Sequence, residues 1–97
     1  MRPVLHGDVS TAARALLHVP AGRRSGLCRR LIAEAEIADR YRRLTGRLHP
    51  RFGNGSLMSA AFKYPLHREP NFDHRDYCCC VIQVLQRLND RRALVRP

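Results

Sequence analysis

The sequence predicts an all-α fold, a small array of about four helices of unequal length. Apolar residues recur at spacings of three and four positions in separate segments, as they do on one face of a helix. Prolines and glycines fall between these segments, where helices would end. No window alternates apolar and polar residues convincingly as a strand does. Since 97 residues make one domain's length, we expect residues 1–97 to form a single helical domain.

The first helix is expected over residues 9–18. Its apolar residues fall on one face, at the positions Val9, Ala12, Ala13, Leu16 and Leu17. Asp8 has the side chain of a helix N-cap, and Pro20 cannot continue a helix. These two residues therefore bracket the element.

The second helix is expected over residues 23–44 and is the longest. Its apolar stripe consists of Leu27, Leu31, Ala35, Ala38 and Tyr41, with Cys28 and Ile32 beside it. Glu36 precedes Arg40 by four positions, and Asp39 precedes Arg43 by four, the favourable order for ion pairs on a helix. Gly46 is expected to end the helix.

A short third helix is expected over residues 57–63, capped by Ser56 and closed by Pro65. The last helix is expected over residues 74–91, capped by Asn71 or Asp73 and packed against the long second helix. A frayed tail should follow at 93–97. The apolar face of the last helix is formed by Tyr77, Cys78, Val81, Ile82, Leu85 and Leu88.

The charge of the chain narrows its functional class. Eighteen basic residues face eight acidic ones, which gives a net charge of +10, and such a surface attracts polyanions. Nearly all the basic residues are Arg, which suits phosphate recognition but also follows from a GC-rich genome. A bilayer span takes about 20 apolar residues, and no such run and no secretory segment occur. We therefore expect no membrane contact and a cytoplasmic protein.

Arginines crowd the second helix and the loop after it. Nine arginines but only three acidic residues lie between positions 23 and 51, so most of these cations cannot be paired there. The sequence predicts contact with nucleic-acid phosphates without base reading, because the helix is long for a recognition helix and aromatic residues are sparse. The predicted contacts are Arg29, Arg30, Arg40, Arg43, Arg47 and Arg51.

Two other interpretations of this surface stay open. It could be a solvated face, or it could dock an acidic partner protein as an interaction adaptor, with the short helix at 57–62 adding an apolar patch. The small size and the apolar helix faces also favour self-association into a homo-oligomer.

The loop at 47–56 is a candidate anion site. Gly53 and Gly55 permit close backbone approach, and the helix that follows Ser56 would present amides to an anion. The Gly-Lys-Ser/Thr ending of a P-loop is missing. The alternative is an ordered turn in which Ser56 caps the helix and Phe52 enters the core.

A third interpretation is a small metal-binding or redox protein. His74 and Cys78 stand four positions apart, within reach of Cys79 and Cys80, and folding could add His67 and Cys28. No paired zinc motif completes this set, and no nucleophile has a fixed base. We therefore expect no metal, no cofactor and no catalysis, with the cysteines mainly in the core.

Four stretches resemble short uncharacterised proteins of Rhodobacter-like alphaproteobacteria, over most of the chain. They are residues 1–9, 31–40, 49–58 and 76–78, which include His-Pro-Arg-Phe-Gly-Asn-Gly-Ser. Such bacteria carry phage-derived gene transfer agents, and the chain is similar in size and helical content to their small terminase subunits. The resemblance identifies a bacterial lineage and carries over no catalytic residues. The similarity in size suggests an accessory role in DNA packaging, and transcription control is the other role that the basic surface allows.

Overall fold

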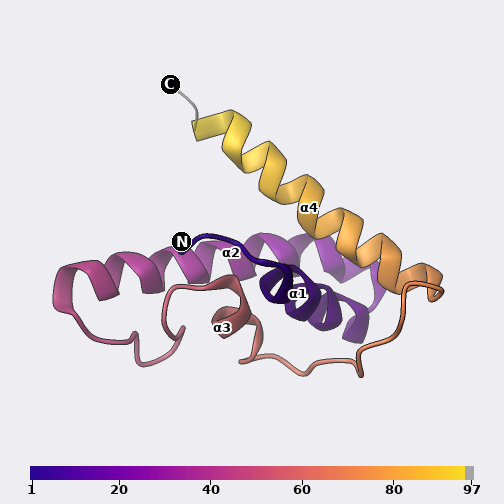
Figure 1. The fold of residues 1–97 in the computed structure, drawn as a ribbon, viewed down its shortest axis with the longest axis horizontal. Helices are drawn as coiled ribbons and strands as arrows, with labels where there is room; N and C mark the ends of the chain where they lie inside the picture. Colours follow the sequence, from indigo (N-terminus) through magenta and orange to yellow (C-terminus); the bar gives the residue numbers. More distant parts are fainter. Residues whose placement is uncertain (96–97) are drawn as a thin grey trace.

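The computed structural model describes residues 1–95, with side chains as far as Arg92. Over this range it contains four helices and no strand, so the predicted all-α class is confirmed (Figure 1). The helices are α1 (His6–His18), α2 (Ala21–Thr45), α3 (Leu57–Ala61) and α4 (Arg75–Val95). Each lies close to an expected segment, and the differences are at the ends.

Helix α1 is the centre of the molecule and contacts each of the other three helices. Its buried residues point in several directions around the helix axis rather than along one stripe, and three of them are the fully buried alanines Ala12, Ala13 and Ala15. The buried part of α1 is wider than the single stripe of a surface helix, although His6 and His18 stay exposed, and alanine lets neighbouring backbones approach closely. The small side chains of α1 therefore let three helices pack around it.

The start of α1 differs from the prediction. The helix begins at His6, with Leu5 as the N-cap residue, and Asp8 lies at the third helical position. The Asp8 carboxylate accepts a hydrogen bond from the backbone N–H of Leu5 at 2.8 Å. Asp8 thus closes the helix start from inside the first turn, the reverse half of a capping box, and not as the N-cap itself.

Helix α2 carries the predicted buried face, and its end is also as predicted. Cys28, Leu31, Ile32, Ala35 and Ala38 are buried, while Leu27 and Tyr41 are half-buried at the edge of the face. Gly46 ends the helix in the left-handed conformation, with a φ of 73°, which glycine adopts at no steric cost.

Helix α4 packs chiefly against α1, and its contact with α2 is the smallest between any two touching helices. The expected pairing of the last helix with the long second helix is therefore a minor contact. The cap is His74, whose Nδ1 accepts from the Tyr77 N–H at 3.1 Å, and neither Asn71 nor Asp73. Sequence pattern alone did not distinguish these neighbouring acceptors.

The end of α4 extends away from the other helices (Figure 1). The helix runs to Val95, so the tail expected to fray at 93–97 falls partly within α4. Its last two residues lie outside the part of the chain that the structure describes. Within the described part, no helix combines the length and the apolar character needed to cross a bilayer.

Candidate nucleic-acid interface

All six arginines predicted to contact phosphates are exposed, on α2 and on the loop that follows it. Arg29 and Arg40 lie eleven residues apart, which is close to three helical turns, so they point to the same side about 16 Å apart. Arg43 lies beside them, and Arg30 is turned by about 100° toward the neighbouring side of the helix. Arg47 and Arg51 continue the basic surface beyond Gly46.

The carboxylates of α2 are engaged elsewhere, which leaves most of these arginines uncompensated. Glu34 accepts hydrogen bonds from the Tyr64 hydroxyl at 2.9 and 3.0 Å. Glu36 pairs with Arg91 of α4, and not with Arg40 as its spacing suggested. Asp39 pairs with Arg43 at 3.2 Å, as its spacing predicted. Among the six arginines, only Arg43 has an ion pair within the described residues.

Two other arginines serve the fold rather than the surface. Arg24 donates from Nε to the carbonyl oxygens of Leu16 and Val19, at 2.9 and 3.2 Å, and so closes the end of α1. Arg14 donates to the His67 carbonyl at 2.8 Å, and the His67 N–H donates back to the Arg14 carbonyl. These two guanidiniums donate hydrogen bonds to carbonyl groups at the end of α1 and in the loop at His67. Composition alone could not distinguish them from the surface arginines.

The structure adds a basic hollow that the sequence prediction missed. Arg29 shares a hollow of about 360 Å³ between α2 and α4 with Arg87 and Arg91, alongside the acidic Glu36 and Asp90. Arg87 also donates to the Ser25 hydroxyl at 2.9 Å. The only sequence signal was the spacing of Arg87 and Arg91 by four positions, which places them on one side of a helix.

In the candidate anion loop at 47–56, the backbone amides that could bind an anion already donate to groups of the protein. The N–H groups of Met58 and Ser59, at the start of α3, donate to the Asp8 carboxylate at 2.8 Å and to the Ser56 hydroxyl at 3.1 Å. Ser56 is therefore the helix cap that the sequence predicted. Because these two amides already have acceptors, they are not available to a bound phosphate.

The glycines of this loop approach the protein's own backbone. A side chain on Gly55 would lie 2.7 Å from Cα of Asp39, and a Cβ on Gly53 would collide with the Ser59 hydroxyl. Gly55 also accepts from the Arg2 N–H at 2.9 Å. Phe52 is half-buried and stacks on His49, with ring centroids 4.7 Å apart. These contacts favour the ordered-turn interpretation for Gly53, Gly55 and Ser56.

Asp39 is held at the same corner of the molecule. Its Oδ2 accepts from the amino group of Met1 at 3.0 Å, and both groups are largely buried. This hydrogen bond, followed by the positive charges of Met1, Arg43 and Arg42, lowers the pKa of Asp39, although burial acts in the opposite direction. The carboxylate therefore stays ionised in the folded protein.

The histidine and cysteine residues proposed as metal ligands are engaged in local structure. His74 caps α4 through Nδ1, and the Cys78 thiol donates to the Phe72 carbonyl at 2.9 Å. Cys28 and Cys80 are buried while Cys79 is exposed, and burial raises the pKa of Cys28 to about 11. No group of three metal-binding side chains occurs within the described residues.

The chain belongs to a family defined by a domain of unknown function, DUF7742, whose model matches residues 2–88. The match covers all of α1, α2 and α3 and most of α4. No curated protein and no solved structure matches the chain.

Proposed function

We propose that this protein is a non-enzymatic accessory protein that binds the phosphate backbone of nucleic acid through the exposed arginines of α2 and the following loop. One observation carries the proposal: Arg29, Arg30, Arg40, Arg47 and Arg51 are exposed and have no ion pair among the described residues. Cations that are not compensated within the protein neutralise phosphates and release counterions on binding.

The side of α2 that carries Arg29 and Arg40 is the centre of the proposed interface. The hollow between α2 and α4 extends this side toward α4 and adds Arg87, since Arg91 is already paired with Glu36. The contacts are with phosphates and carry no sequence information, since phosphate contacts position a protein but do not read bases. The cytoplasm is the proposed compartment. The chain is similar to small terminase subunits of gene transfer agents in size and helical content alone, and on that ground phage-like DNA packaging is the proposed setting, with transcription control as the alternative.

Fluorescence anisotropy with labelled duplex DNA at several salt concentrations tests the proposal. We expect a log–log slope of about −4 to −8, which corresponds to roughly five to nine phosphate contacts. Arg40→Glu combined with Arg47→Glu should reduce the magnitude of this slope by about two. A control with equal change in net charge combines Arg68→Glu with Arg75→Glu, since both residues are exposed and lie outside α2 and its loop.

Two results would overturn the proposal. One is the absence of binding at ~50 mM salt, a condition that strongly favours any phosphate binder. The other is an equal loss of affinity in both double variants, which would mean that only the net charge matters. An acidic protein that displaces the DNA efficiently would favour the adaptor interpretation of the same surface.

The apolar patch that the adaptor interpretation expected on α3 is small. Leu57, Ala60 and Ala61 are buried in the core, and only Phe62 of that segment is a large exposed apolar side chain, with 60% of its surface accessible. This segment therefore contributes one large apolar side chain, Phe62, to any docking surface.

A further inference from the structure

The apolar surface of α4 is wider than the core requires. The residues of α4 that the core buries are Tyr77, Cys80, Val84 and Leu88. Of the face that the sequence predicted, Leu85 and Ile82 are 47% and 63% exposed. Because the core covers only one side of the apolar face of α4, the other side presents apolar residues to solvent. Exposed apolar surface of this kind commonly marks an interaction site.

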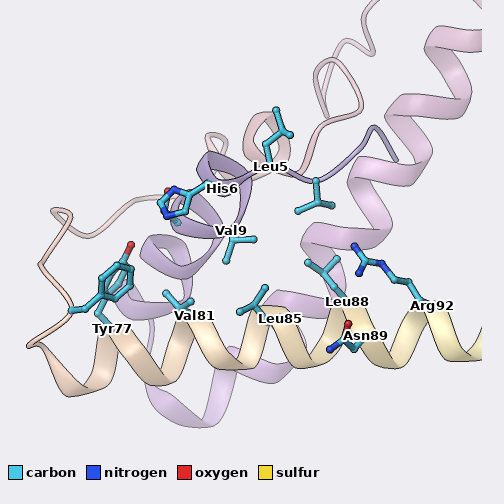
Figure 2. A pocket seen from close by; sticks show the side chains of 12 residues that line it. Leu5, His6, Val9, Tyr77, Val81, Leu85, Leu88, Asn89 and Arg92 are labelled. Carbon is cyan, nitrogen blue, oxygen red and sulfur yellow. The ribbon is translucent and has the colours of Figure 1, made fainter.

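Part of this surface forms a groove between α4 and the start of α1. Its volume is about 320 Å³, and its lining is mostly apolar. Figure 2 shows Val81 and Leu85 rising from α4 toward Val9 of α1, with Leu5 at the opposite edge. Leu5 is 71% exposed, and Phe72, which also lines the groove, is 59% exposed. Two edges of the groove are thus formed by apolar side chains that are largely exposed to solvent.

The length of the groove suits a helix. Its lining includes Tyr77 and Arg92 of α4, which are separated by about four helical turns, or roughly 22 Å. Amphipathic helices bind such grooves through apolar residues at spacings of three, four and seven positions. A peptide helix of about four turns can therefore lie alongside α4.

The charge of the groove identifies the chemistry of its occupant. None of the described residues that line the groove is acidic, and the polar ones are His6, Ser10, Asn89 and Arg92. Arg92 lies toward the C-terminal end of α4, beyond Leu88 (Figure 2). A second copy of the chain would bring another charge of +10 and a second Arg92, which disfavours self-association. A helix with acidic residues beside its apolar face complements the groove.

We propose that this groove binds an acidic amphipathic helix of a partner protein. This surface lies apart from the arginines of α2, so the inference goes beyond the proposed nucleic-acid binding and does not depend on it. The protein would then join nucleic acid on one side to an acidic protein on another.

Anisotropy of a labelled synthetic peptide tests the proposal. The probe is an 18-residue helix-forming peptide, about five turns long, with Leu on one face and Glu on the other. Peptides of the same composition in scrambled order, and with Lys in place of Glu, are the controls. We expect at least ~10-fold weaker binding for both controls, about 1.4 kcal/mol.

Two substitutions on α4 provide a matched comparison. Leu85 lines the groove and Ile82 does not, although both are exposed. Leu85→Gln should weaken binding of the Glu peptide by at least ~5-fold, while Ile82→Gln should change it by less than ~2-fold, because isolated surface positions contribute little. Arg92→Glu should weaken binding of the Glu peptide and favour the Lys peptide. Circular dichroism checks that each variant is folded, and DNA binding should be unchanged in Leu85→Gln.

Three outcomes would overturn the proposal. They are equal binding of the ordered and scrambled Glu peptides, equal effects of the Leu85 and Ile82 substitutions, and a homodimer by light scattering that Leu85→Gln dissociates. The last would assign the groove to a second copy of the chain. Failure of DNA binding alone would leave these results untouched and would count only against the function proposed for α2.

Discussion

Two polar regions of this protein differ in how many of their polar groups the fold itself pairs. The N-terminal corner, which comprises residues 1–8, Asp39, the end of the loop at 53–56 and the start of α3, pairs most of its polar groups internally. The outer side of α2, from Arg29 to Arg40, leaves its arginines in solvent. The two regions differ in the carboxylates available to accept hydrogen bonds or pair with cations. Asp8 and Asp39 both lie in the corner, whereas Glu34 and Glu36 of α2 bind Tyr64 and Arg91.

Polar groups that the fold has already paired are not available to a ligand, so a binding surface can form only where polar groups remain unpaired. In the N-terminal corner, the helix-end amides that could attract an anion are taken by Asp8 and Ser56. On α2 no equivalent acceptor reaches Arg29 or Arg40 within the described residues. Substitutions in the corner should therefore change stability, and substitutions on the outer side of α2 should change binding.

The largest expected effect is from Gly55→Ala. The new Cβ would meet the backbone of Asp39, at 2.7 Å from Cα and 3.0 Å from the nitrogen. Gly55 also has a φ of 94°, where a side chain is strained. We expect a loss of about 3–5 kcal/mol in the free energy of unfolding, measured with urea. A loss below ~1 kcal/mol, the size of an ordinary surface effect, would show that the corner is not tightly packed.

The second effect is from Asp8→Ala. This change removes the acceptor for two backbone amides, those of Leu5 and Met58, at a site where Asp8 is buried. Amides left without acceptors should cost about 2–4 kcal/mol in total. Asp8→Asn keeps one carbonyl oxygen, so it should lie between the wild type and Asp8→Ala in urea unfolding. Equal stability of the two variants would argue against a role for both hydrogen bonds.

The third effect concerns the acid dependence of stability. The hydrogen bond from Met1 holds the pKa of Asp39 below its ordinary value. The ionised form is therefore favoured in the folded state, and its contribution is fully present above the unfolded pKa of about 3.9. It is lost as the pH falls through the lower pKa of the folded protein.

Asp39→Asn tests this contribution and should lower stability by about 1–2 kcal/mol at neutral pH. Urea unfolding of both proteins should show a constant difference down to about pH 5 and a smaller difference below about pH 4. A difference that does not shrink in acid would assign the effect to packing rather than to charge.

The smallest effect is a gain of stability at an exposed position of α2, about one turn before Arg29. Gly26 lies within the helix, is exposed, and has no atom within 4 Å of the position that a Cβ would take. Gly26→Ala should therefore raise the free energy of unfolding by about 0.5–1 kcal/mol. This substitution is the matched control for Gly55→Ala, and a decrease would show that the surface around Gly26 is packed in solution.

Local patterns determined much of this protein. The helical periodicity, the breaks at Pro20 and Gly46, and the cap at Ser56 depend on steric and hydrogen-bonding preferences of a few neighbouring residues, so the sequence by itself predicted the four helices and the buried face of α2. The net charge likewise follows from composition and needs no structure.

Only the tertiary structure decided which polar groups meet over long distances. Asp8 reaches Met58 across fifty positions, and Glu36 prefers Arg91 of another helix to Arg40 of its own. It also decided that α4 packs against α1, which buries Val84 and leaves Leu85 at an open groove. Periodicity defines an apolar arc on a helix, but the part of that arc that is covered depends on how the neighbouring helices approach, and that is set by packing across the whole chain.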